Sequence, residues 1–464
     1  MKGMRFGVVF IGVGAIVGGI FGGVVTAYWA AGAAEKWGFK GAAGLTNLLI
    51  LMLVFVMVIA TLLTLAERKW SAMMQDRVGP NRARLAIIPG IGKMELAGIP
   101  HIITDVLKML TKEAFRPRGA NAFLFNLGPM LAFAPVFALF AIVPAGPTIP
   151  VLGHQIQMVV AAPDFGILYL FAIASLAVYG TSIAGWASNN KFALLGGVRA
   201  ASQMISYEVA LGLSLVGMMI AFNTVALAGP TGMAEMQAGY LWRFTPEGSF
   251  DIGIQRWGIL LQPVGFVLFF AAAFAETKRA PFDVPEGESE IIGYFVEYSG
   301  MQFGLFMISE FVEVVVLSGV LAAIFFGGWS LPIGDEWLRA QFLTNGQFNP
   351  NTAWLYGSIM GTVFWIKVVL LCYLQLAIRW TFPRFRYDQI QTLGWKILLP
   401  AGLINLFVSG ALILWDPSLR ALAIAGAIEI GIVIALTLTP RERSEDAHGA
   451  HGHGGHDAHA AAGH

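Results

Sequence analysis

The sequence predicts an all-α, polytopic membrane helix bundle of about ten transmembrane helices, with cytoplasmic loops and an interfacial amphipathic helix. Of the 464 residues, 57% are hydrophobic and 12% are charged, about half the charged share of an ordinary soluble domain. The mean hydropathy is +0.70. Apolar runs long enough to cross a bilayer recur along the chain, whereas the alternating pattern of a transmembrane barrel is absent from the sequence.

Ten apolar runs are the predicted spans, and each is expected to be a helix because a helix satisfies its backbone hydrogen bonds internally. They cover residues 6–33, 45–66, 123–144, 163–186, 203–227, 256–275, 303–327, 352–378, 395–415 and 419–439. We divide them into a core of eight helices at 45–415, an extra N-terminal helix within 1–44 and an extra C-terminal helix within 416–443.

The two ends of the chain leave alternatives open. The first segment also has features of a signal peptide, but its apolar stretch exceeds the usual length of about 7–15 residues, so we favour a retained helix. Residues 444–464 carry six of the eight histidines among Gly and Ala, a composition that cannot pack a core and predicts a disordered tail. Loose zinc or nickel binding and a plain solvated tail are both compatible with it.

The basic residues predict the orientation. Of 29 lysines and arginines, 22 fall in the segments on the side of the N-terminus, six fall on the other side, and Lys367 lies inside a span. This bias places both termini in the cytoplasm. The single cysteine, Cys372, excludes an intrachain disulfide and a cysteine-held iron–sulfur cluster within the chain, and we predict no metal site.

Carboxylates crowd between the sixth and seventh spans. Six of them lie within 23 residues: Glu276, Asp283, Glu286, Glu288, Glu290 and Glu297. Glu208, Glu310 and Glu313 lie at span edges or inside spans. Charge beside or within a bilayer is costly and marks ion or proton pathways. Neighbouring carboxylates raise one another's pKa and titrate together, which predicts a protein that moves protons or responds to charge.

Four charged groups inside spans or at their edges are considered one by one. Glu310 and Glu313 are three residues apart and point to similar sides of a helix, and we weight Glu310 above Glu313. A structural hydrogen bond is the alternative to a proton-path role for Glu208. Lys367 requires a carboxylate or a water-filled cavity inside the membrane, and we expect it to pair with one of the glutamates.

Two further loops lie on the cytoplasmic side. In the first, Gly79-Pro80 predicts a turn, and Ile102, Ile103, Val106, Leu107 and Leu110 recur at helical spacing. Asp105 and Lys108 lie among them, so this stretch is predicted to be an amphipathic helix along the interface. The second loop is expected at residues 186–203.

Eight motifs together resemble one family. They are Glu67-Arg-Lys, Arg77-Val-Gly-Pro-Asn, Gly185-Trp-Ala-Ser-Asn-Asn-Lys, Ser206-Tyr-Glu, Ala275-Glu-Thr-Lys-Arg-Ala-Pro-Phe-Asp, Glu286-Gly-Glu-Ser-Glu, Glu297-Tyr-Ser-Gly-Met-Gln-Phe and Pro383-Arg-Phe-Arg-Tyr-Asp. Over about residues 45–415 the chain resembles the H subunit of bacterial NADH:quinone oxidoreductase (respiratory complex I), the counterpart of mitochondrial NADH dehydrogenase subunit 1. The stretches at 84–100 and 228–255 are longer than is usual in that family.

The resemblance implies a subunit of an enzyme, inactive alone, in the bacterial inner membrane. It implies that this chain holds no cofactor, that quinone is the substrate, and that iron–sulfur clusters, FMN and NADH belong to partner subunits. The implied partners are the peripheral-arm subunits of the quinone module, the small membrane subunits, quinone and the lipid bilayer, with no nucleic acid. The subunit would form the quinone chamber and link quinone reduction to proton pumping through buried carboxylates.

The resemblance and the chemistry of the side chains together give the candidate site residues. The expected quinone-binding residues are Arg68, Arg77, Asp105, Lys108 and Arg279. The expected proton pathway comprises Glu208, Glu276, Asp283, Glu286, Glu288, Glu290, Glu297, Glu310 and Lys367. The expected loop-shaping residues are Gly79, Pro80, Arg384, Arg386 and Asp388.

Two other functions remain as alternatives. The first is the homologous membrane subunit of a proton-pumping hydrogenase or a ferredoxin-linked complex. The second, a secondary transporter, is weak, because such a protein typically has inverted repeats and the sequence has no internal repeat.

Overall fold

The computed structural model describes residues 47, 55–83, 98–151, 154–245, 251–287, 290–344, 347–349 and 352–438. The predicted first span, the His-rich tail and Glu288 lie outside these residues. Within them the chain is an all-α bundle, and six helices are long and apolar enough to cross a membrane. The predicted fold class is confirmed.

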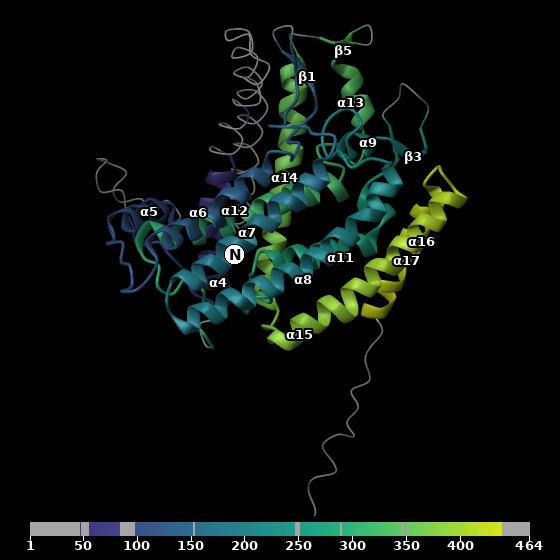
Figure 1. Ribbon diagram of the computed structural model, residues 1–464. Helices are drawn as coiled ribbons and strands as arrows, with labels where there is room; N and C mark the ends of the chain where they lie inside the picture. Colours follow the sequence, from purple (N-terminus) through teal and green to yellow (C-terminus); the bar gives the residue numbers. More distant parts are fainter. Residues whose placement is uncertain are drawn as a thin grey trace, which may run out of the picture.

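The helices follow the predicted order (Figure 1). Their bounds are α4 (Met57–Met74), α5 (Pro100–Thr111), α6 (Ala122–Phe140), α7 (Gly166–Ala187), α8 (Lys191–Phe222), α9 (Met233–Met236), α10 (Gly258–Leu261), α11 (Pro263–Glu276), α12 (Gly300–Phe325), α13 (Asp335–Gln341), α14 (Ala353–Thr381), α15 (Tyr387–Thr392), α16 (Leu399–Trp415) and α17 (Arg420–Leu438). A π-helical turn, Leu393–Leu398, joins α15 to α16.

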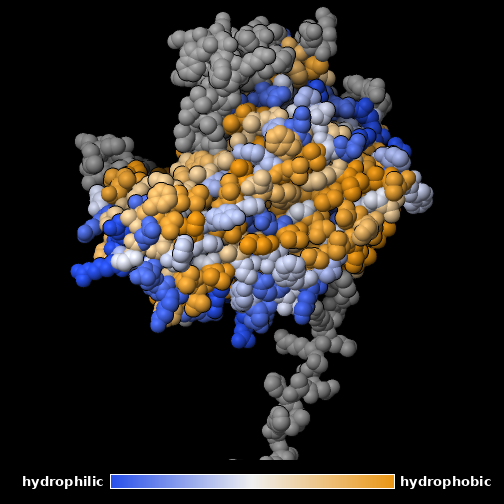
Figure 2. Space-filling view, in the orientation of Figure 1, coloured by the Kyte–Doolittle hydropathy of each residue, from blue (hydrophilic) through white to orange (hydrophobic). Residues whose placement is uncertain are grey.

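Three small antiparallel hairpins interrupt the helices. They pair β1 (Ile149–Val151) with β2 (His154–Ile156), β3 (Tyr240–Arg243) with β4 (Gly253–Gln255), and β5 (Leu343–Thr344) with β6 (Gln347–Phe348). In Figure 1, β1, β3 and β5 lie with α9 and α13 toward the upper right, whereas α5 lies at the left. Figure 2 shows a broad hydrophobic surface between hydrophilic side chains at the lower left and the upper right, as expected of a membrane protein.

Helix α12 is the centre of the bundle. It is buried from Ser309 to Phe325 and is contacted by α4, α6 and α14. Small residues let the surrounding helices approach closely. A Cβ added to Gly180 of α7 would collide with the backbone nitrogen of Ala132 of α6, so glycine permits this contact, as is common between membrane helices.

The structure corrects several predicted boundaries. Helix α8 begins at Lys191, so the loop expected at 186–203 shrinks to three residues. The cause is a cap, because the Asn190 side chain accepts a hydrogen bond from the backbone N–H of Phe192 at 3.0 Å. Helix α4 continues past Ala66 to Met74 and carries the first charged motif on its last turns. The span expected at 256–275 breaks at Gln262 into α10 and α11.

Candidate functional site

A cleft of about 530 Å³ opens at the end of α4. Its lining comprises Glu67, Arg68, Ser71, Arg77, Gly79, Pro80 and Trp380. Four of these, Arg68, Arg77, Gly79 and Pro80, were singled out by the sequence. Gly79 has φ +73°, and an added Cβ would lie 3.0 Å from the Cβ of Ala72, so the turn requires glycine at this position. Two arginines thereby share one concave surface.

Helix α5 is joined to this cleft by ion pairs. Asp105 meets Arg68 at 2.7 Å and Lys108 at 3.7 Å. The predicted amphipathic helix is confirmed over Pro100–Thr111. Asp105 and Lys108 therefore act on the cleft through Arg68, and they are absent from its lining.

Glu67 connects the cleft to the interior of the protein. Its carboxylate meets Arg379 of α14 at 2.5 Å and Arg279 at 3.0 Å. Arg279 is 6% exposed, and its guanidinium carbon lies 4.1 Å from the centre of the Phe311 ring of α12. The structure therefore places Arg279 behind Glu67, between α4, α12 and α14, and outside the cleft lining.

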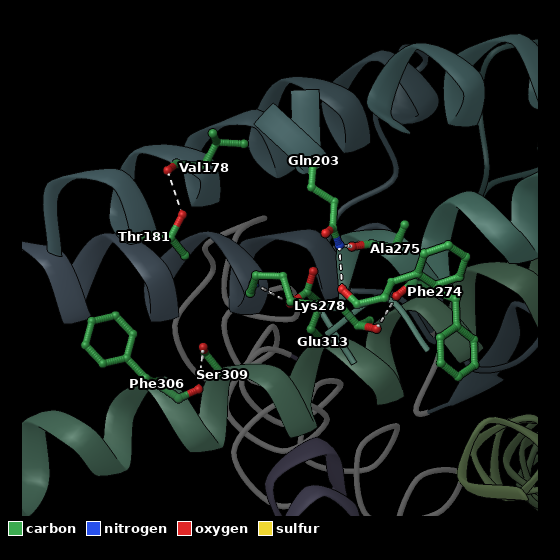
Figure 3. Close-up of polar contacts among 11 residues, drawn as sticks. Val178, Thr181, Gln203, Phe274, Ala275, Lys278, Phe306, Ser309 and Glu313 are labelled. Carbon is green, nitrogen blue, oxygen red and sulfur yellow. Dashed lines mark hydrogen bonds and ion pairs between the residues drawn. The ribbon is translucent and has the colours of Figure 1, made fainter. Parts of the chain in front are cut away.

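The residue before Arg279 turns toward a different carboxylate. Lys278 Nζ lies 3.7 Å from Glu313 Oε2 of α12, and the two side chains are 5% and 6% exposed. Figure 3 shows this pair between the turn after α11 and α12. Gln203 of α8 fixes the turn, because its Nε2 donates to the carbonyls of Ala275 at 2.8 Å and Phe282 at 2.9 Å. Sequence reasoning missed both Lys278 and Gln203.

Further carboxylates surround this pair. Glu276 and Glu310 are both buried. Glu286 hydrogen-bonds with Glu310, and burial, followed by the charge of Glu310, holds the pKa of Glu286 well above its usual value of 4.5. Burial by itself lowers the pKa of Lys278, but the charges of the neighbouring glutamates, Glu313 first, outweigh it and raise that pKa.

A cavity of about 20 Å³ lies next to Glu276 and Glu313, between these residues and helices α6, α7 and α8. Glu208 of α8, Glu276 of α11 and Glu313 of α12 line it together with apolar side chains from α6 to α8. Ser175 Oγ donates to Glu208 Oε1 at 2.5 Å. The volume suffices for about one water molecule. Three carboxylates from three helices thus meet around one small cavity.

The remaining members of the acidic loop lie nearer the surface. Glu290 pairs with Arg199 at 2.8 Å and is about half exposed, and Glu297 accepts from Asn190 at 2.7 Å. Asp283 is half-buried. Arg384 lies against Gly287 of the loop, because an added Cβ there would collide with its Nη2 atom. Arg386 and Asp388 are exposed at the start of α15.

Lys367 lies elsewhere. Its Nζ donates to the backbone carbonyls of Phe326, Gly328 and Ser330 at 2.7, 2.9 and 2.6 Å, and it lies 4.4 Å from the centre of the Trp257 ring. Phe326 is the first residue after α12 and lies 13 residues after Glu313. Along a helix this separation corresponds to a distance of roughly 20 Å. The expected pairing of Lys367 with a glutamate of this group is wrong, since the turn after α12 presents its backbone carbonyls to the lysine.

Among the residues that the structure describes, no cluster of three or more His, Cys, Asp or Glu side chains could hold a metal ion. The polar side chains described above form two groups. One is the cleft with Glu67, Arg68 and Arg77. The other we call the buried group: it comprises Lys278, Glu276, Glu310 and Glu313, which are buried, and Glu286 and Glu208, which are half-buried.

Comparison with known proteins places these residues in a family. The family model described as NADH dehydrogenase matches residues 46–410. The first of the H subunits of NADH-quinone oxidoreductase from Cytophaga hutchinsonii is 40% identical over 360 residues, which are 77% of this chain and 93% of the relative. The H subunit from Flavobacterium psychrophilum is 39% identical over 79% of this chain and 96% of the relative. The second H subunit from Syntrophobacter fumaroxidans is 39% identical over 79% and 95%.

Proposed function

The chain belongs to the NADH dehydrogenase family as a membrane subunit of an NADH-quinone oxidoreductase complex, and on that premise we propose that it forms the quinone chamber and links quinone reduction to proton translocation. The cleft at Arg68 and Arg77 receives the quinone head group. Electrons come from iron–sulfur clusters in partner subunits, which also hold FMN and bind NADH. In this proposal the peripheral arm docks on the cytoplasmic face of the bacterial inner membrane, where both termini of this chain lie.

The chemistry of the cleft supports the first half of the proposal. Its volume of about 530 Å³ falls within the usual range for small-molecule sites, about 300–1,000 Å³. The guanidinium groups of Arg68 and Arg77 can stabilise the anion that forms as a quinone is reduced. Asp105 holds Arg68 in place, and Lys108 in turn faces Asp105.

One observation carries the second half. Glu67 lines the cleft and pairs with Arg279, and the adjacent Lys278 pairs with Glu313 at the buried cavity. A change of charge in the cleft therefore acts first on Glu67. It then acts on the adjacent Arg279 and Lys278, and through them on carboxylates in a poorly hydrated interior. Electrostatic coupling is strong there because the local dielectric is low. Protonation of Glu208, Glu276 and Glu313 follows the redox state of the quinone.

The test uses inverted membrane vesicles that carry the whole complex. Glu208→Gln keeps the size and hydrogen-bonding capacity of the side chain at the cavity but removes its titration. We expect NADH-driven acidification of the vesicle lumen to fall about tenfold, the factor that corresponds to about 1.4 kcal/mol. Glu290→Gln is the matched control, since it removes a carboxylate of the acidic loop that is about half exposed and lies outside the buried group.

Complex content is measured on native gels and by bound flavin, so that turnover refers to assembled enzyme. Normal pumping in the Glu208→Gln variant, or equal losses in the two variants, would contradict the proposal.

A further inference from the structure

The segment that follows α5 carries an excess of cations. Lys112, Arg116 and Arg118 are exposed, together with one carboxylate, Glu113. No ion pair joins any of the three cations to another residue that the structure describes, whereas Lys108, one turn before Lys112, faces Asp105. Three cations against one carboxylate leave this segment with a net attraction for anions.

An exposed apolar face adjoins these cations. Ile103, Leu107 and Leu110 recur at helical spacing on α5 and are 50%, 54% and 59% exposed. Phe115 in the cationic segment is 59% exposed as well. The other face of α5 is packed on α12, where an added Cβ on Gly304 would lie 2.8 Å from the sulfur of Met109. Packing thus fixes which face of α5 stays open.

The cationic segment is held in place. Ser299, the residue before α12, accepts a hydrogen bond from the backbone N–H of Phe115 at 3.1 Å and donates to the carbonyl of Glu113 at 2.7 Å. Gly300 has φ +59°, and an added Cβ would lie 2.9 Å from the Lys112 carbonyl. The cations therefore stand at a fixed position beside the apolar face.

We propose that α5 and residues 112–118 form a binding site for an acidic phospholipid. The phosphate of the headgroup binds Lys112, Arg116 and Arg118, and the acyl chains lie along Ile103 and Leu107. A molecule with one anionic and one apolar end matches both surfaces, as at other amphipathic helices with basic residues beside them. The site does not require that the cleft bind quinone, so the two proposals fail separately.

The experiment uses the purified, intact complex in nanodiscs of phosphatidylcholine. A phosphatidylglycerol that carries a photoreactive group in one acyl chain is added, irradiated and located by peptide mass spectrometry. We expect labelling of peptides from residues 100–119. In the Arg116→Gln/Arg118→Gln variant the apparent affinity falls about 25-fold, about fivefold for each cation lost. Lys191→Gln/Lys396→Gln removes two exposed cations elsewhere and leaves the labelling unchanged.

Three results would overturn the proposal. Equal labelling by a photoreactive phosphatidylcholine would reduce the site to an apolar contact with bulk lipid. Loss of labelling in millimolar inorganic phosphate would identify a site for the free anion. Loss of peripheral-arm subunits from the Arg116→Gln/Arg118→Gln complex would assign these cations to a protein partner.

Discussion

Two lysines beside α12 have opposite surroundings: Lys278 is buried against the middle of the helix, and the half-buried Lys367 faces the turn that follows it. Lys278 meets the carboxylate of Glu313, with Glu276, Glu310 and Glu286 as further neighbours. Lys367 meets three backbone carbonyls and the Trp257 ring. Carboxylates can take up protons, whereas carbonyls cannot. The middle of α12 therefore faces groups whose charge can change, whereas the turn after α12 is held by a lysine among groups whose charge cannot.

The largest effect is expected for Lys278→Met. This substitution leaves Glu313 buried without its cation, and breaking a buried pair by removal of one partner costs about 3–5 kcal/mol. We expect coupled turnover to fall about 100-fold, measured as NADH-driven quinone reduction and lumen acidification per assembled complex. Lys278→Arg retains the charge and should recover part of the activity. Equal losses in the two variants would show that shape, and not charge, matters at this position.

Glu67→Gln tests the link between the cleft and the buried group. It removes the negative charge that holds Arg279 and Arg379, and a hydrogen bond to a charged group contributes about 1.5–3 kcal/mol. We expect turnover at saturating quinone to fall about tenfold in steady-state kinetics. A variant in which only the KM for quinone rises would confine Glu67 to substrate binding and break the proposed connection.

Lys367→Met is expected to affect stability more than turnover. Three carbonyls lose their donor, and a buried polar group without a partner costs about 1–3 kcal/mol. The purified complex should therefore inactivate faster on heating, while turnover per assembled complex stays within about twofold of wild type. If turnover falls as far as in Lys278→Met, the surroundings of the two lysines do not differ in function in the way described above.

The smallest effect is a change in pH dependence. The pKa of Glu286 is raised, mainly by burial, above its usual 4.5, so the folded protein keeps this proton after the unfolded chain has lost it. The stability contributed by Glu286 is present below pH 4.5 and falls as the pH rises toward the raised pKa, by at most about 1.4 kcal/mol per pH unit. Thermal unfolding of Glu286→Gln should depend less steeply on pH above 4.5. An unchanged slope would contradict the raised pKa.

The fold class followed from the sequence because the membrane imposes a simple pattern on it. Long apolar runs mark the spans, and the spacing of Ile103, Leu107 and Leu110 marked α5. Boundaries were predicted less well where a single side chain decides them. Asn190 caps α8 and starts that helix twelve residues earlier than predicted, because the charged Lys191 and Arg199 led the prediction to treat residues 191–202 as a loop.

Parts of the site followed from the sequence and parts did not. Arg68, Arg77, Gly79 and Pro80 lie close together in the chain and share one cleft. The pairing of Lys278 with Glu313 depends on which way a short turn faces after α11, and sequence spacing does not encode that direction. The partners of Lys367 are backbone carbonyls, which every residue possesses, so the sequence contains no side-chain pattern from which this contact could be predicted.

The central claim is that the redox state of quinone in the cleft sets the protonation of Glu313 through Glu67, Arg279 and Lys278. Reduced-minus-oxidised infrared difference spectra of the purified complex measure this most directly, because protonated carboxyl groups absorb apart from carboxylates. The account predicts a carboxyl band that appears or vanishes on quinone reduction in the wild type and is missing in Glu313→Gln. Identical difference spectra for the two proteins would contradict it.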